Sequence, residues 1–112
     1  MDVQHERELE IEGAAKDIAD RLSRWADASG FVCIRDTEKG WSYERGSTLA
    51  ATYTFDIRKI PTEVQVSIVS EDPLKMNCKW RVHSPLQIST PGDGERIAEQ
   101  FDLLIAYLKG AL

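Results

Sequence analysis

The residue types that most often carry chemistry are scarce in this sequence. It contains two histidines, His5 and His83, and two cysteines, Cys33 and Cys78. A zinc site needs three or four ligands at suitable spacing, and these four residues are spread along the chain without forming a cluster. We therefore expect neither a metal site nor a cofactor.

A nucleophilic or acid–base site finds no better support. Cys78 lies on the apolar side of an alternating segment and His83 on its polar side, so their side chains are expected on opposite faces of a strand. Asp36, Glu38 and Glu44 surround a predicted hairpin turn, where water prevents the shifted pKa that general acid–base catalysis requires. The sequence predicts no catalytic residue, and we favour a protein without enzymatic activity.

Length and composition limit the class of protein. The 112 residues suit one domain spanning residues 1–112, and a composition of 42% hydrophobic and 29% charged residues is ordinary for a globular chain. The net charge of -5 excludes a basic protein that coats nucleic acid. The longest apolar run, 103–108, is far shorter than the roughly 20 residues of a membrane span, and the polar start resembles no secretory signal. We expect a cytoplasmic protein without membrane contact.

Two segments show the spacing of an amphipathic helix. The first is expected over residues 4–29, followed by Gly30 as a stop, and its apolar face comprises Ile11, Ala15, Ile18, Leu22 and Trp25. The second begins at Thr90 and Pro91 and ends at Gly110. Its apolar positions are Ile97, Phe101, Leu104 and Leu108.

The segment between the helices alternates with the period of two that is typical of strands. Strands are expected at 31–35, at 41–58 as one bulged strand or two short ones, at 64–68 and at 74–83. Turns are expected at Glu38-Lys39-Gly40 and Asp72-Pro73. Both cysteines are expected to be reduced and mostly buried, with a bridge between neighbouring strands as the alternative.

This order predicts an α+β fold. We expect a two-layer sandwich in which an antiparallel sheet of four or five strands, connected as a meander, carries the N-terminal and C-terminal helices on one face (α-β-β-β-β-α). The first and last strands of the meander then form the edges of the sheet.

Two surfaces remain uncovered in this arrangement. The open sheet face carries basic side chains that suit an acidic partner, and the candidates there are Arg58, Lys75, Lys79, Arg81 and His83. The last helix is apolar almost all round at 103–108, where Leu103 and Tyr107 are candidates for a dimer or partner interface. The alternative interpretations are a solvated face and a helix flank that the first helix covers.

We therefore expect a small protein-binding module of the adaptor, chaperone or inhibitor type, whose partner is another protein or a second copy. The layout has a broad likeness to small bacterial secretion chaperones and toxin-immunity proteins. The first alternative is a small-ligand-binding protein or an enzyme with a pocket between helices and sheet, lined by Trp25, Trp41, Tyr53 and Trp80. The second, which the acidity of the chain disfavours, is weak nucleic-acid binding through the basic last strand.

Overall fold

Five strands and two helices make up the part of the chain that the computed structural model describes, residues 2–46, 61–83 and 91–110. Side chains are described for 4–46, 61–83 and 95–110. The elements follow in the order β1 (Asp2–Ile11), α1 (Ala15–Ser29), β2 (Val32–Asp36), β3 (Gly40–Arg45), β4 (Thr62–Glu71), β5 (Leu74–His83) and α3 (Pro91–Leu108).

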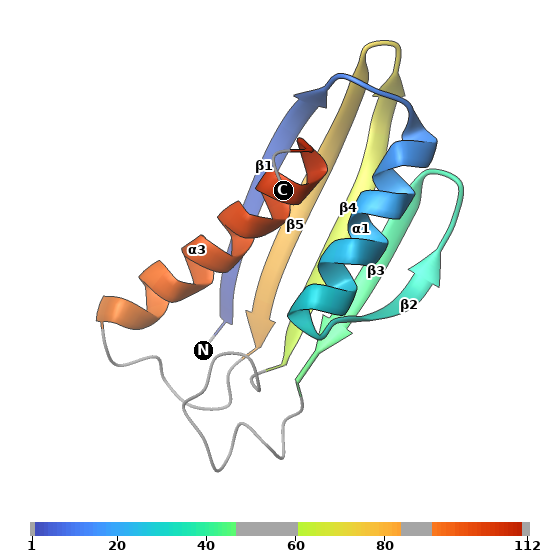
Figure 1. The fold of residues 1–112 in the computed structure, drawn as a ribbon. Helices are drawn as coiled ribbons and strands as arrows, with labels where there is room; N and C mark the ends of the chain where they lie inside the picture. Colours follow the sequence, from blue (N-terminus) through green and yellow to red (C-terminus); the bar gives the residue numbers. More distant parts are fainter. Residues whose placement is uncertain (1, 47–60, 84–90, 111–112) are drawn as a thin grey trace.

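The strands form one sheet in the order β1-β5-β4-β3-β2, and every neighbouring pair is antiparallel. Both helices lie across the same face of this sheet (Figure 1). The expected two-layer α+β sandwich is therefore confirmed, with five strands and with helices on one face only.

The helix expected over residues 4–29 is wrong in its first half. Asp2–Ile11 is a strand, and the helix begins only at Ala15. Leu9 and Ile11 are buried, whereas the glutamates between and beside them are exposed, which is the period-two burial of a strand with one covered face. The chain therefore begins with a strand, and the order is β-α-β-β-β-β-α.

This extra strand changes the position of β5 in the sheet. β1 pairs with β5 along its full length, from Asp2 opposite His83 to Ile11 opposite Leu74. The sheet edges are consequently β1 and β2, and the expectation that 74–83 forms an edge is wrong. Strand β5 is paired on both sides, because β4 occupies its other edge.

The core lies between the helices and the alternating apolar positions of β4 and β5. Trp80 of β5 is 1% exposed and contacts aromatic rings from both helices. Its ring centroid lies 6.2 Å from that of Trp25 in α1 and 6.1 Å from that of Phe101 in α3. Phe31, which follows α1, lies 5.5 Å from Trp80 and stacks on Trp25 at 4.6 Å. The predicted apolar side of 74–83 is therefore the side that both helices cover.

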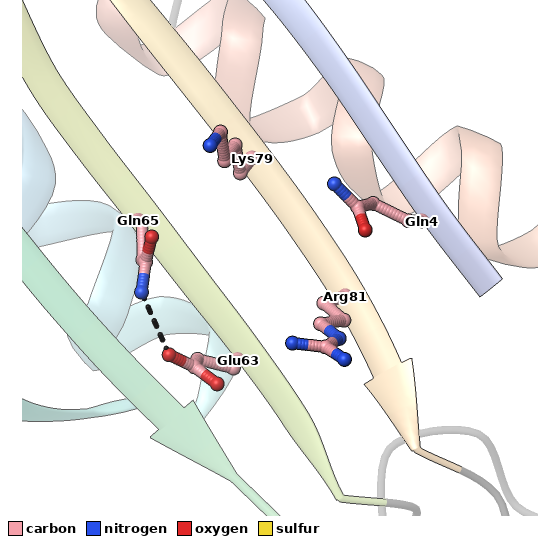
Figure 2. A pocket seen from close by; sticks show the side chains of 5 residues that line it. All are labelled: Gln4, Glu63, Gln65, Lys79 and Arg81. Carbon is pink, nitrogen blue, oxygen red and sulfur yellow. Dashed lines mark hydrogen bonds between the residues drawn. The ribbon is translucent and has the colours of Figure 1, made fainter. Parts of the chain in front are cut away.

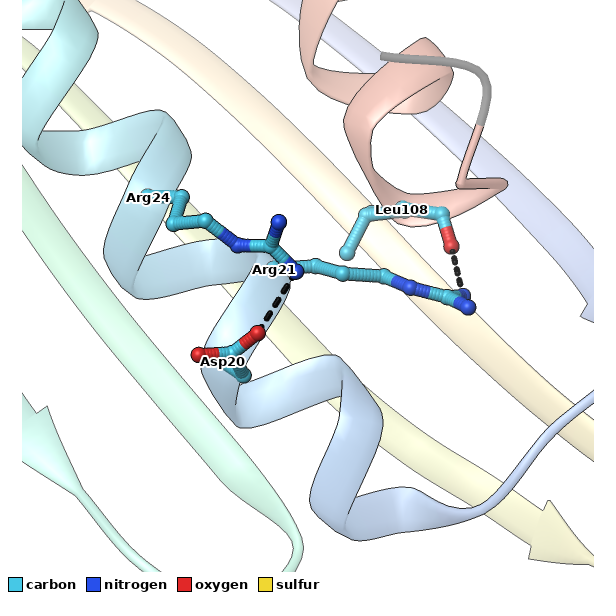
Figure 3. Close-up of polar contacts among 4 residues, drawn as sticks. All are labelled: Asp20, Arg21, Arg24 and Leu108. Carbon is cyan, nitrogen blue, oxygen red and sulfur yellow. Dashed lines mark hydrogen bonds and ion pairs between the residues drawn. The ribbon is translucent and has the colours of Figure 1, made fainter.

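Both helices end as the sequence predicts, and polar contacts tie them together. Gly30, with φ 75°, terminates α1, and Gly110, with φ 73°, follows α3. These are left-handed conformations that glycine adopts at little cost. Nη1 of Arg21 in α1 donates to the carbonyl of Leu108 at the end of α3, at 2.8 Å (Figure 3). Because carbonyls at a helix end have no partner within the helix, this cation stabilises the end of α3.

The two cysteines occupy different environments. Cys78 is fully buried, and this burial raises the pKa of its thiol to about 12. Cys33 is exposed, because every residue of the edge strand β2 is exposed, so the expectation that both thiols are buried is wrong for Cys33. Both thiols are free, and β2 and β5 are not neighbours, which excludes the alternative of a bridge between adjacent strands.

The expected hairpin turn at Glu38-Lys39-Gly40 is confirmed, since β2 and β3 pair on either side of it. The turn at Asp72-Pro73 likewise joins β4 to β5. Of the segment 41–58, β3 accounts for the beginning, and residues 47–60 lie outside the described part of the chain.

The burial of Leu9 gives a direct test of strand β1. We expect Leu9→Ala to lower the free energy of unfolding by about 2–5 kcal/mol, the range for deleting a buried leucine side chain. The neighbouring change Glu8→Ala is the matched control, because Glu8 is exposed, and surface substitutions of this kind stay within about 0.5 kcal/mol. Urea denaturation of the two variants provides the measurement. Equal effects of the two substitutions would contradict the burial of one face of β1.

The raised pKa values predict a loss of stability in alkaline solution. Burial raises the pKa of Tyr43 from 10.0 to about 12, as it raises that of Cys78 from 9.0 to about 12. Between these values the unfolded chain has lost protons that the folded protein retains, so the free energy of unfolding falls as pH rises through this window. The decline should begin above the ordinary thiol pKa and continue toward the folded-state values.

Urea denaturation between pH 8 and pH 10.5 measures this slope. Cys78→Ala and Tyr43→Phe each remove one of the two groups, and each should flatten the decline. A slope that persists unchanged in the double variant would show that other groups cause it.

Candidate functional site

The open face of the sheet carries most of the basic candidates. Lys75, Lys79, Arg81 and His83 alternate along β5 with side chains that the helices cover, so they project from the opposite face. Arg58 lies outside the described residues. Figure 2 shows Lys79 and Arg81 beside Gln4, Gln65 and Glu63 around a shallow polar hollow of about 130 Å³.

Strand β1 places carboxylates beside this basic row. Lys75 pairs in register with Glu10, and Lys79 pairs with Glu6. On the other side, Arg81 pairs with Glu63 of β4. Residues directly opposite each other on antiparallel strands project from the same face. The open face therefore alternates in charge. A helix over residues 4–29 leaves no strand beside β5 to carry Glu6 and Glu10, so the sequence analysis does not predict this alternation.

Hydrogen bonds engage part of this polar face. Nε2 of Gln65 donates to Oε1 of Glu63 at 2.8 Å (Figure 2), and Nδ2 of Asn77 donates to Oε1 of Glu6 at 3.2 Å. In each pair, an amide side chain and a glutamate on the exposed face satisfy part of each other's hydrogen-bonding capacity. The arrangement has the character of a solvated face with a small polar hollow, rather than of a continuous basic surface.

The two candidates on α3 differ in their surroundings. Leu103 is 42% exposed, whereas Tyr107, one helical turn further on, is partly buried and packs against the core. Most of the apolar run at 103–108 is accounted for by burial, since Leu104, Ile105 and Leu108 belong to the core. Leu103 is the member of the run that remains open, and it borders a groove.

We call this hollow the helix–sheet groove. It lies on the covered side of the sheet, between the end of α1, the end of β3 and the middle of α3, and has a volume of about 410 Å³. Its apolar wall is formed by Trp25, Trp80 and Leu103, and its polar wall by Ser29, Arg45 and Gln100. The accessible lining of the groove is polar and apolar in nearly equal parts, because both tryptophans are only 1% exposed. Concave surfaces that combine apolar area with a few polar groups are typical of small-ligand sites.

The pocket predicted between helices and sheet is thus present in part. Trp25 and Trp80 line it as expected, Trp41 is buried away from it, and Tyr53 lies outside the described residues. Trp25 and Trp80 are held by ring contacts with each other and with Phe31. These rings form a packed aromatic cluster beneath the groove.

Arg45 is the groove residue that the sequence analysis missed. Its Nη1 donates to the carbonyl of Ser29 at 3.0 Å, and its Nη2 donates to Oε1 of Gln100. Its Cζ lies 4.4 Å from the centre of the Phe31 ring, a cation–π contact. One signal was available: Arg45 has the same parity as the buried Trp41 and Tyr43, so a strand pattern places this charge on the covered face.

Comparisons with solved structures define the class of fold. The chain superimposes on Ara h 8.0201 with a TM-score of 0.59 and 8% identity, over 99% of this chain and 97% of that one. It superimposes on the Aha1 dimer from Colwellia psychrerythraea with a TM-score of 0.59 and 11% identity, over 98% and 96% of the two chains. For a putative uncharacterized protein from Bacillus thuringiensis the TM-score is 0.56 and the identity 8%, over 97% and 98%. The chain therefore shares its α+β fold with these solved structures, which are of the Bet v1-like or helix-grip type.

No protein-family model and no curated protein matches the sequence. Within the described residues, no helix is long and apolar enough to cross a membrane. The same part of the chain contains no group of three histidine, cysteine, aspartate or glutamate side chains that could hold a metal ion.

The alternating charges of the open face predict a coupling between β1 and β5. Lys79→Glu places a carboxylate opposite Glu6, and like charges in this position destabilise a sheet by about 0.2–1 kcal/mol. The double variant Glu6→Lys with Lys79→Glu restores opposite charges and should recover most of this loss. Thermal unfolding of the two single variants and the double variant measures the coupling energy. A double variant whose loss equals the sum of the single losses would contradict a direct interaction.

Proposed function

We propose that this protein is a non-catalytic binding domain that takes up a small, mainly apolar ligand in the helix–sheet groove. The observation that carries this proposal is the groove itself, an open volume of about 410 Å³ beside the exposed Leu103 and the buried rings of Trp25 and Trp80. A side chain such as Leu103 gains free energy when an apolar ligand removes it from water. The sequence analysis placed a protein partner first, and the groove reverses that order.

The chemistry around the groove fits binding better than catalysis. Its polar wall consists of a guanidinium, a carboxamide and the end of α1. A guanidinium stays protonated near neutral pH and so cannot act as a general base, and a carboxamide is neither an acid nor a base in this range. These groups orient and hold a ligand, and they do not supply a proton-transfer pair.

A protein partner at the open sheet face is the second candidate. The polar hollow between Lys79, Arg81 and Glu63 supports it, because it offers donors and an acceptor to a polar peptide group. Lys75 and His83 extend this face along β5, and a second copy of the chain remains a candidate partner. The carboxylates that β1 adds to the face disfavour nucleic acid, whose binding requires a basic footprint.

Binding of an apolar molecule in the groove can be tested with a neutral apolar dye. We expect N-phenyl-1-naphthylamine to bind with a rise in its fluorescence, because the dye is bright only in apolar surroundings. Ala28→Trp introduces a large side chain at an exposed position of the groove wall and should abolish this binding. Fluorescence titration of wild type and variant measures the difference.

Ser23→Trp is the matched control, because Ser23 is exposed on the same helix and does not line the groove. This variant should bind the dye as wild type does. A wild-type protein that does not bind the dye, or an Ala28→Trp variant that binds it equally well, would refute the proposed function. If the protein instead binds a protein partner at the open sheet face, the groove need not bind the dye, and one of these two results is expected.

A further inference from the structure

The polar hollow on the open sheet face is lined by two cations whose charges are not paired. Lys79 and Arg81 stand two residues apart on β5, so they project from the same face about 7 Å apart. Within the described part of the chain, neither side chain makes a hydrogen bond or an ion pair. Lys79 is partly exposed and Arg81 is exposed, so a ligand can reach both. Because β5 is paired on both sides, the backbone holds the two positions at a set spacing.

The carboxylates nearest to these cations hydrogen-bond to amide side chains instead. Glu6 of β1 lies opposite the lysine, and its Oε1 accepts from Asn77. Glu63 of β4 lies opposite the arginine, and its Oε1 accepts from Gln65 (Figure 2). Among the described residues, Glu63 is the one carboxylate that lines the hollow, against two cations. The lining therefore carries an excess of positive charge although the protein as a whole is acidic.

Two carboxamides add further donors to the hollow. Gln4 of β1 lies opposite the arginine, and Gln65 of β4 lies opposite the lysine. A carboxamide nitrogen carries two hydrogens, so Gln65 retains one N–H beside its bond to Glu63. Donors from three neighbouring strands thus surround one small space. A phosphate group, with three strong acceptor oxygens, matches such a set of donors better than a carboxylate with two oxygens.

We propose that this hollow binds the phosphate group of a phosphorylated serine side chain in a partner protein. This inference goes beyond the groove and gives the second candidate function, a protein partner at the open sheet face, a defined chemistry. The phosphate lies between Lys79 and Arg81 and accepts charge-assisted hydrogen bonds from both. A volume of about 130 Å³ suits one such group rather than a whole ligand, and the shallow hollow is within reach of a short side chain. The open sheet face around it leaves room for the peptide that carries the group.

The charges around the hollow favour a single phosphate over a chain of phosphates. Glu6 and Glu10 lie beside the basic row on β1, and Glu63 lies beside it on β4. These carboxylates and the net charge of -5 repel a polyanion. Nucleic acid requires a continuous basic footprint for its successive phosphates, whereas one phosphate group needs only the space between the two cations.

A matched pair of peptide mixtures tests this selection. The probe has a central phosphoserine with randomised neighbours and blocked ends, and the control mixture has serine at the same position. Phosphoserine carries a charge of about -2 at pH 7.5. We expect immobilised wild-type protein to bind the phosphorylated mixture at least tenfold more tightly than the control mixture. Inorganic phosphate should compete, but only at a concentration at least tenfold higher than that of the phosphopeptides.

Substitution of the two cations tests their roles. Lys79→Gln and Arg81→Gln should each weaken binding of the phosphorylated mixture several-fold, and the double variant should abolish the preference for it. Lys39→Gln and Arg35→Gln are the matched controls, since both residues are exposed outside the hollow and their substitution makes the same change in net charge. These two variants should retain the tenfold preference.

Removal of the one carboxylate in the lining should have the opposite effect. Glu63→Gln keeps the shape of the side chain but removes its repulsion of the phosphate, and it should strengthen binding of the phosphorylated mixture several-fold. Glu38→Gln, at the exposed hairpin turn, makes the same change in net charge away from the hollow and should bind as wild type does. This pair tests the proposal even if a variant that lacks a cation does not fold.

The outcomes distinguish this inference from the proposed function. Equal binding of the two peptide mixtures would overturn it, as would a preference that survives in the Lys79→Gln and Arg81→Gln double variant. Competition by inorganic phosphate at the concentration of the peptides would overturn the assignment to a protein partner. The dye binds on the opposite face of the sheet, so a protein that selects phosphopeptides but does not bind the dye would refute the groove function alone.

Discussion

Trp80 is the side chain of the sheet that contacts both helices. It belongs to β5, which is paired on both sides within the sheet, and its ring contacts Trp25 of α1 and Phe101 of α3. Two helices that touch one large, nearly inaccessible ring are held at a fixed distance from each other and from the sheet. Burial of such a ring contributes more to stability than burial of a small aliphatic side chain. The helix–sheet groove lies beside these buried rings, where Ala28 and Leu103 are the exposed members of its lining.

Strand β1 shows how the placement of a few charged residues alters a surface. Without it, the row of basic residues on β5 would lie along an edge and form a basic stripe. With it, Glu6 and Glu10 lie opposite Lys79 and Lys75, and the open face becomes mixed in charge. Inward-facing residues of the same strand contact α3 instead. His5 lies 6.0 Å from the ring of Phe101, and the guanidinium of Arg7 lies 5.4 Å from it.

The sequence predicts the layers and the burial of β5, because a strict alternation over ten residues assigns its apolar side chains to one face and its polar side chains to the other. It predicts the N-terminal strand poorly, because Ile11 fits two periods at once. Ile11 stands four residues before Ala15, as on a helix, and two residues after Leu9, as on a strand. The polar His5 and Arg7 occupy the covered side of this strand and hide its alternation. Propensity alone cannot decide such a case, because the choice depends on pairing with β5, a distant part of the chain.

The groove was predictable only in part, for a similar reason. Parity places Trp80 on the covered side, but the space between two helices depends on where each crosses the sheet, which no local pattern encodes. Val32 and Ile34 also show that a local sequence pattern does not determine which residues the helices cover. Their apolar character favours burial, yet both are exposed because the edge strand β2 extends beyond the cover of the helices.

Three arginines attach α3 to the rest of the described fold, each from a different element. Arg7 of β1 lies 3.4 Å from the carboxylate of Asp102, and Arg21 of α1 bonds the carbonyl of Leu108. Arg45 of β3 bonds Gln100. Of the three, Arg45 is the one that also lines the groove. The residue that ties the middle of α3 to the sheet is thus also part of the groove wall, so the position of the helix and the shape of the groove depend on the same guanidinium.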